Sequence, residues 1–309
     1  MNYEECIDKM INVQKALLEF FEENSSAEEN FEILITIIKE QQIMEDQHEL
    51  KELLLLVSSI SNNHCRINNF NNKIEQIILY LKDKITKYFS NSEIFQLFEF
   101  NKRILLFLIL EGIMKIDKYV FSRLQNIKYH DMNNPDYFLQ EIHEFLVEYL
   151  FEGFVKAEII ENIKKEKKNG SHEIDEKRKL GENDDYLCKL IRLNEVKEFG
   201  AYVNKNNISL QSYINESKFE TNLFLMKQKK VSLIEYAAFF GSIEIIKYMK
   251  INGDVELTPS MWLYAIHSQN AELIKYLEDN HISPPKNDYL PILKESIKCF
   301  KFMMFQITL

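Results

Sequence analysis

Residues 232–254 read SLIEYAAFFGSIEIIKYMKINGD, which places two helix-forming segments on either side of a glycine. Ala237 and Ala238 have almost no side-chain volume, so the first segment can lie close against the second. In the second segment the apolar residues between 243 and 249 recur at helical spacing. Gly241 can adopt a positive φ without penalty, which allows a tight turn between the helices. The stretch therefore predicts a helical hairpin that can stack on similar hairpins.

The same pattern returns 28 residues further along the chain. Eight of the 21 positions in residues 232–252 are identical in residues 260–280. The identical positions in the second copy are Ser260, Tyr264, Ala265, Glu272, Ile274, Lys275, Tyr276 and Asn280. A fixed period of this kind indicates a repeat architecture, in which no single unit can bury its apolar face alone.

The repeated unit resembles the ankyrin repeat, whose family pattern is roughly T-P-L-H-x-A-A-x-x-G-H-x-x-I-V-x-x-L-L-x-x-G-A-D. Residues 232–241 match the first half of that pattern, and residues 243–249 match its second half. The period is shorter than the ankyrin value of about 33 residues, so we expect an abbreviated loop between units. Gln269 and Asn270 replace the glycine turn in the second copy. We expect Asn270, which tolerates the left-handed region, to preserve that turn.

Residues 234–241 and 256–267 are also similar to one large ankyrin-repeat family that is expanded in parasitic protists. In that family the repeats follow a helical region of unknown function, and no enzymatic activity is implied. The similarity is most specific from about residue 184 to residue 299. It implies an all-α protein that holds another protein through its repeats.

The composition also predicts an all-α fold, because only seven Gly and five Pro accompany a hydrophobic content of 46%. Fifteen of the 25 residues from 161 to 185 are charged, which indicates a boundary or an exposed insertion. We predict a helical N-terminal region of unknown function over residues 1–163 and a charged linker or insertion over residues 164–183. A short, irregular ankyrin-like helical solenoid then covers residues 184–309. Its parts are a diverged unit at 184–230, units at 231–257 and 258–286, and a truncated unit at 287–309.

Apolar stripes and capping spacings predict the helices of the N-terminal region. Over residues 3–21 we expect an apolar stripe on one face, formed by Ile7, Met10, Ile11, Leu17, Leu18 and Phe21. Ser90 followed by Glu93 has the spacing of a capping box, in which each residue bonds the other's backbone at the start of a helix. Ser26 and Glu29 have the same spacing.

The run from Ile104 to Leu110 is apolar on every side. A β-strand is the competing interpretation, but the surrounding helix formers favour a helix that is covered on both flanks. The hairpin that contains this run resembles a worn repeat unit, and stacking would then begin near residue 92.

The net charge and the spacing of the cysteines limit the kinds of partner and the cellular location that we expect. The net charge of −10 argues against nucleic acid, and the longest purely apolar run is far shorter than the roughly 20 residues that cross a bilayer. The start of the chain lacks the basic residues and apolar run of a signal peptide. Cys6, Cys65, Cys188 and Cys299 lie far apart without zinc-knuckle or disulfide-framework spacing. We therefore expect a cytoplasmic protein, with a nuclear location as the alternative.

No motif makes a strong case for catalysis or metal binding. His64 beside Cys65 could pair a nucleophile with a base, but adjacent side chains seldom point at each other. Residues 130–136 resemble a calcium loop only loosely, because the central glycine and the terminal glutamate are missing. We predict no enzymatic activity, no cofactor and no bound metal. Two basic clusters at 164–168 and 177–179 resemble an import signal, but their interleaved acidic residues favour a solvated linker.

The ankyrin resemblance implies which side chains face a partner. In such stacks the alanine pair faces the core, while the residues that flank it on the first helix line a concave groove. Carried over position by position, this places in the groove Tyr236, Phe239, Phe240, Tyr264, His267 and Ser268. Adjacent exposed Phe side chains would be an anchor of the kind that interfaces use. The alternative is that Phe239 and Phe240 are buried under the polar insertion at residues 204–230.

Two further expectations concern the core and the insertion. Trp262 is expected in the core. The residues expected to pin the insertion to the stack are Tyr213, Phe219, Leu223 and Phe224.

The last ten residues, 300–309, carry one charge where the family would continue into a polar-faced helix. Because repeat stacks need a solvated end, an apolar end favours self-association or partner docking, and a truncated or misread reading frame explains it equally well. Our leading hypothesis is a non-catalytic protein–protein interaction scaffold that binds another protein through its repeats. The alternative is an oligomerising accessory or structural protein that acts through its helical N-terminal region.

Overall fold

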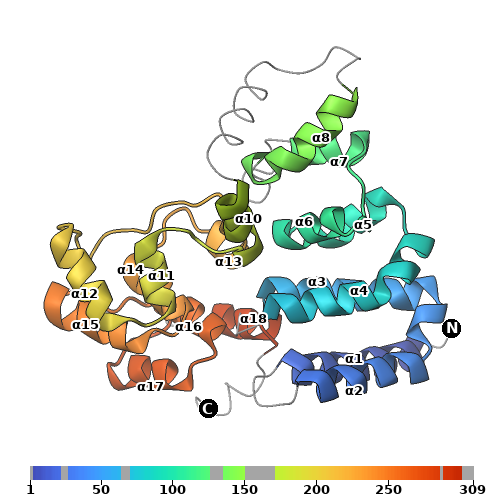
Figure 1. The fold of residues 1–309 in the computed structure, drawn as a ribbon. Helices are drawn as coiled ribbons and strands as arrows, with labels where there is room; N and C mark the ends of the chain where they lie inside the picture. Colours follow the sequence, from blue (N-terminus) through green and yellow to red (C-terminus); the bar gives the residue numbers. More distant parts are fainter. Residues whose placement is uncertain are drawn as a thin grey trace. The chain divides into compact units, whose positions relative to one another are not determined.

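The computed structural model describes residues 3–21, 27–63, 70–125, 135–149, 171–285 and 288–300 (Figure 1). Within these ranges the chain is all-helical and contains no β-strand. An isolated antiparallel bridge joins Tyr213 to Ser232. The predicted all-α class is therefore confirmed. None of the described helices is both long and apolar enough to cross a membrane.

The chain divides into two compact units. The N-terminal unit contains residues 1–62 and 66–175, and the C-terminal unit contains residues 63–65 and 176–309. The division between residues 175 and 176 falls inside the segment 164–183, where the charged composition predicts a boundary.

The helices of the N-terminal unit follow the apolar stripes of the sequence. They are α1 (Tyr3–Phe21), α2 (Ala27–Glu40), η1 (Ile43–Glu45), α3 (Gln47–Asn63), α4 (Phe70–Tyr88), α5 (Asn91–Phe98), α6 (Lys102–Leu110), α7 (Lys118–Leu124), η3 (Pro135–Phe138) and α8 (Leu139–Tyr149). Helix α1 packs against α2 and α4, and α5 packs against α6 and α7. The helix predicted over Ile104–Leu110 is confirmed as most of α6.

The buried face of α1 differs from the predicted stripe. Val13, Leu17 and Phe20 are fully buried, whereas Ile7 is 44% exposed and Ile11 is 57% exposed. Steps of three and four residues place the first three side chains on one face, and the two isoleucines lie off that face. The prediction was therefore right for Leu17 and Phe21, which are fully buried, and wrong for Ile7 and Ile11.

The capping box at the start of α5 is confirmed. The Glu93 backbone N–H donates to Ser90 Oγ at 3.4 Å, and the Ser90 backbone N–H donates to Glu93 Oε2 at 2.8 Å. Ser26 of the second predicted box lies outside the described residues.

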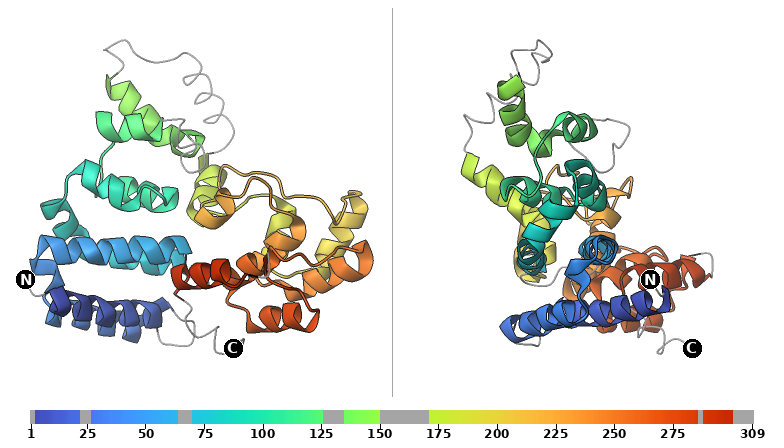
Figure 2. Two further views of the ribbon diagram at one scale, coloured as in Figure 1. Left: turned by 180° about the vertical axis from the view of Figure 1, so that it is seen from behind. Right: turned by 90° about the vertical axis from the view of Figure 1, so that its right-hand side faces the viewer.

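The C-terminal unit consists mainly of short helix pairs. Its helices are α10 (Ser171–Leu180, which crosses the division), α11 (Tyr186–Arg192), α12 (Val196–Lys205), α13 (Leu223–Met226), α14 (Leu233–Phe239), α15 (Ile243–Gly253), α16 (Met261–Ser268), α17 (Ala271–Asp279) and α18 (Leu290–Lys298). Helix α14 packs against α11, α15 and α16, and α16 packs against α17 and α18. In Figure 2 the orange and red helices from α14 to α18 follow one another through this unit.

The turns inside the helix pairs use left-handed backbone. Gly241 has φ 68°, and the Ser242 N–H after it donates to the Ala237 carbonyl at 2.9 Å. Asn194 has φ 54° between α11 and α12. This geometry pairs carbonyl groups that the end of a helix would otherwise leave without a partner.

The second repeat keeps this turn, but not through the expected residue. Gln269 has φ 55°, while Asn270 has φ −90° and begins α17 as its N-cap. The Asn270 side chain accepts the backbone N–H groups of Glu272 at 3.0 Å and Leu273 at 3.3 Å. Asn270 therefore stabilises the start of α17 as its N-cap, and Gln269 takes the left-handed position of the turn.

The insertion at residues 204–230 is held by apolar and backbone contacts. Phe219 is buried, and Leu223 and Phe224 are half-buried. Tyr213 remains 56% exposed, so the prediction that its side chain pins the insertion is wrong. The backbone holds this part instead, because the Ile214 N–H donates to the Val231 carbonyl at 2.9 Å.

Candidate functional site

Most of the six side chains predicted to line a groove lie in the interior of the C-terminal unit. The buried ones are Tyr236, Phe239, Tyr264 and His267. Phe240 and Ser268 are partly exposed. Trp262 is buried as predicted, and its Nε1–H donates to the Ile282 carbonyl at 2.8 Å.

Phe224 explains why three of these side chains, those of Phe239, Tyr264 and His267, are covered. It lies on α13, within the insertion, and its ring stacks on Phe239 with the centroids 5.9 Å apart. The same ring lies 5.0 Å from the ring of Tyr264 and 4.2 Å from that of His267. Phe239 is therefore buried beneath the insertion at residues 204–230, as the alternative interpretation expected. Phe240 remains partly exposed.

Tyr236 belongs to a buried polar network. Arg192 Nη1 donates to Tyr236 Oη and to the Asn183 carbonyl, both at 2.8 Å. Arg192 Nε also pairs with Glu182 Oε2 at 2.5 Å. Burial, followed by the charge of Glu220, raises the pKa of Tyr236 well above its ordinary value, so its hydroxyl stays neutral. This network joins α11 to α14 and has a structural role.

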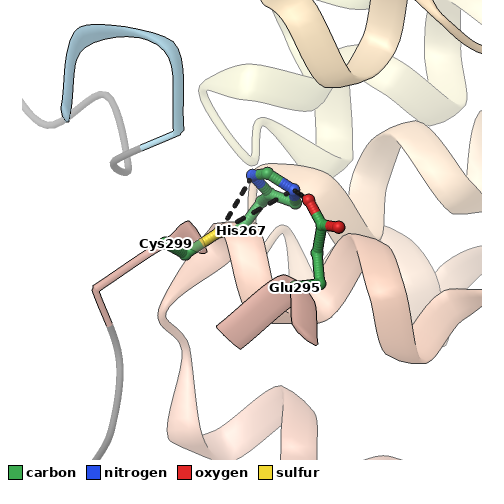
Figure 3. A group of neighbouring side chains, drawn as sticks. All are labelled: His267, Glu295 and Cys299. Carbon is green, nitrogen blue, oxygen red and sulfur yellow. Dashed lines mark hydrogen bonds and ion pairs between the residues drawn. The ribbon is translucent and has the colours of Figure 1, made fainter. Parts of the chain in front are cut away.

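His267 lies beside two residues that the sequence analysis did not single out (Figure 3). His267 Nε2 is 3.0 Å from Glu295 Oε1. Cys299 Sγ is 3.5 Å from His267 Nδ1 and 3.8 Å from His267 Nε2. His267 comes from α16, Glu295 from α18, and Cys299 directly follows α18. We call these three residues the His267 cluster.

Helix geometry accounts for the cluster. Glu295 and Cys299 are four residues apart, which places them on the same face of a helix. His267 precedes Glu295 by 28 residues, so the two stand at the same position of successive repeats. The packing of α16 against α18 then brings the imidazole to the carboxylate.

Two side chains share the Glu295 carboxylate. Lys298 Nζ donates to Glu295 Oε2 at 2.8 Å, and His267 takes Oε1. Burial by itself raises the pKa of Glu295, but the hydrogen bonds from His267 and Lys298 outweigh it and lower that pKa below its usual value. Glu295 is therefore ionised at neutral pH.

The order thiol, imidazole and carboxylate matches a nucleophile, a base and an orienting acid. Cys299 is fully buried and His267 is buried, so a substrate would have to open the packing to reach the sulfur. The burial argues against catalysis by this cluster. Its nitrogen, oxygen and sulfur atoms are also all metal-ligand types, and they lie within 4.8 Å of one another.

The other candidates in the sequence lie mainly outside the described residues, including His64, Cys65 and residues 130–134. The sequence did contain a pattern from which the His267 cluster could have been found. Glu295 and Cys299 lie on one helix face, and Glu295 follows His267 by one 28-residue period. Comparisons with protein families, curated proteins and solved structures gave no match for this chain.

Proposed function

We propose that the chain is a non-catalytic protein–protein interaction scaffold whose C-terminal unit is a short, irregular, ankyrin-like solenoid. The proposed binding surface is the exposed apolar face of the last described helix, α18. The observation that carries the proposal is that Tyr289, Leu290 and Leu293 of this face stand at repeat positions that are buried in the two preceding repeats.

Contacts between successive turns support a stack of repeats. Ser242, which follows the turn of one pair, donates its hydroxyl to the Ile191 carbonyl near the turn of the preceding pair. Asn270 Nδ2 donates to the Gly241 carbonyl at 3.0 Å in the next step along the chain. Each turn is thus bonded to the one before it, which fits nearest-neighbour stacking.

Equivalent positions in α14, α16 and α18, the first helices of successive repeats, differ in burial: they are buried in α14 and α16 but exposed in α18. Positions occupied by Leu233, Ile234 and Ala237 in α14 and by Met261, Trp262 and Ala265 in α16 are all buried. Their equivalents one period later are Tyr289, Leu290 and Leu293, which are 51%, 51% and 39% exposed. Ile297, one turn after Leu293, is 46% exposed. We call these four residues of α18 and its N-cap the α18 face.

The α18 face fits a partner segment with an apolar stripe and acidic borders. Lys294 and Lys298 are exposed on the same helix, next to the apolar side chains. Opposite charge at the rim of an interface favours encounter and fixes register, while the apolar centre supplies affinity. The expected partner is therefore an amphipathic helix of another protein with Asp or Glu beside its apolar face.

The experiment compares the full chain with Leu293→Lys/Ile297→Lys and with Ile251→Lys, a matched control at an isoleucine that is 81% exposed on α15. Quantitative affinity purification identifies proteins captured by the wild-type chain, and purified partners are titrated against all three chains. The double variant is expected to weaken binding at least tenfold without a change in Tm, while the control binds normally. Equal binding by the double variant would exclude the α18 face. Light scattering reports whether the occupant is instead a second copy.

A second candidate function is self-association through the N-terminal unit. The exposed pair Ile7 and Ile11 on α1 favours it, because two apolar side chains one turn apart can seat a second helix. Light scattering of the full chain is expected to show an oligomer that Ile7→Lys/Ile11→Lys dissociates. A monomer at all concentrations would remove this candidate.

A further inference from the structure

We propose that His267, Glu295 and Cys299 bind a divalent transition-metal ion of the zinc class, and that the ion fastens α16 to α18. The inference is independent of the proposed partner binding, since it concerns the interior of the C-terminal unit rather than its exposed face.

The three donor atoms lie close enough together to converge on one metal ion. Zinc binds nitrogen, oxygen and sulfur at about 2.0 to 2.3 Å, so neighbouring ligand atoms are separated by roughly 3.3 to 3.6 Å. His267 Nε2 lies 3.0 Å from Glu295 Oε1 and 3.8 Å from Cys299 Sγ. Because Cys299 Sγ also lies 3.5 Å from His267 Nδ1, a metal on Nε2 requires the Cys299 side chain to rotate toward Glu295. The third separation, between sulfur and oxygen, is within 4.8 Å.

The chemistry of the donors selects the class of metal. A thiolate and an imidazole favour zinc and related transition metals over Mg²⁺ and Ca²⁺, which prefer oxygen ligands. A thiolate and a carboxylate together carry two negative charges, which neutralise a divalent ion in a buried place. Three protein donors leave one coordination position, which a water molecule would complete.

The surroundings would hold the donors in place. Lys298 binds Glu295 Oε2 and leaves Oε1 directed at His267, as outer hydrogen bonds do for metal-ligating carboxylates. The rings of Phe224 and Phe239 flank the imidazole at 4.2 and 5.1 Å. They restrict the orientation of His267 and limit the access of water.

The positions of the ligands on two helices mean that a bound metal would link α16 to α18. Glu295 and Cys299 are held at a fixed distance because they are one turn apart on one helix. His267 comes from the preceding repeat, on α16. A bound ion would therefore cross-link two successive repeats within the C-terminal unit. A structural ion contributes its binding free energy to folding.

The test uses the metal-stripped full chain with Co²⁺ and Zn²⁺ as probes. One equivalent of Co²⁺ is expected to give sulfur-to-cobalt charge-transfer absorption and the visible bands of a tetrahedral site. One equivalent of Zn²⁺ is expected to displace the Co²⁺ and to raise Tm. Absence of the charge-transfer band in the wild-type chain would overturn the proposal without reference to any variant.

Variants assign the ligands. Cys299→Ser, His267→Gln and Glu295→Gln, each checked for helix content by circular dichroism, are expected to weaken Zn²⁺ binding at least tenfold. Cys6→Ser and His281→Asn are matched controls at a thiol and a histidine outside the cluster and should bind as the wild type does. A Zn²⁺-dependent rise in Tm that persists in all three ligand variants would contradict the assignment. These readouts depend on the metal alone, so they are unaffected by the outcome at the α18 face.

Discussion

Gly241 and Gln269 stand 28 residues apart and end the first helices of successive pairs with the same left-handed backbone, at φ 68° and 55°. The backbone thus keeps the repeat period at a position where the side chain does not. A residue other than glycine pays a conformational cost in this region. The second repeat therefore has a turn that a better residue can improve.

Gln269→Gly is expected to stabilise the protein by about 1 kcal/mol, because it removes the cost of the left-handed conformation. The substitution also removes Gln269 Nε2, a buried donor with no hydrogen-bond partner among the described residues. Urea denaturation should show a higher midpoint. Gln125→Gly is the matched control, because Gln125 has φ −89° and gains nothing from glycine. A lower midpoint for Gln269→Gly would contradict this account of the turn.

Gly241→Ala should destabilise the first repeat by about 1 to 2 kcal/mol from backbone strain alone. An added Cβ would also lie 3.1 Å from Asn270 Cβ and 3.2 Å from Ser268 Cβ, so the neighbouring turn must shift. Gly112→Ala separates the two causes, because Gly112 has φ 65° but no atom within 4 Å of its added Cβ. The free energy of unfolding should fall further for Gly241→Ala than for Gly112→Ala. Equal losses would mean that the two turns do not press on each other.

Phe239→Ser is expected to cost about 3 kcal/mol or more, because it removes a buried ring that stacks on Phe224. Phe240→Ser should cost much less, since that side chain is only partly buried. Chemical denaturation of the two variants measures the difference. A small loss for Phe239→Ser would instead indicate that Phe224 leaves this position readily and that the predicted groove opens.

The parts of the fold that depend on local spacing could be predicted from the sequence. The capping box at Ser90, the helix through Ile104 and the turn at Gly241 each depend on residues within a few positions of one another. The face of α1 was harder, because several apolar residues surround the helix and only the packing of α2 and α4 selects Val13 over Ile7.

The candidate site could be predicted only in part, because its residues meet through tertiary packing. The cover over Phe239 comes from Phe224, and the insertion that carries Phe224 has no periodicity from which its path could be predicted. Glu295 and Cys299 reach His267 only because α18 packs on α16. The 28-residue period placed His267 and Glu295 at equivalent positions, but it did not predict that equivalent positions touch.

Alkaline pH should destabilise the C-terminal unit through Cys188 and Tyr236. Burial and the charge of Asp185 raise the pKa of Cys188 from 9.0 to about 12, and the pKa of Tyr236 is raised well above 10.0 for similar reasons. Because the folded state holds both protons more tightly, the stability is fully present below about pH 9, where the unfolded chain is also protonated. It is lost as the pH rises toward 12, since the unfolded chain ionises first.

Melting curves between pH 7 and pH 11 should therefore show a constant Tm up to about pH 8.5 and a decline above it. Tyr236→Phe is expected to cost about 1 kcal/mol at pH 7, because Arg192 Nη1 loses one of its two acceptors. The same variant should flatten the alkaline decline, because one of the groups with a raised pKa is gone. Tyr289→Phe is the matched control, because Tyr289 is half exposed and should leave the slope unchanged. Parallel curves for Tyr236→Phe and the wild type would show that the buried hydroxyl does not set the alkaline limit.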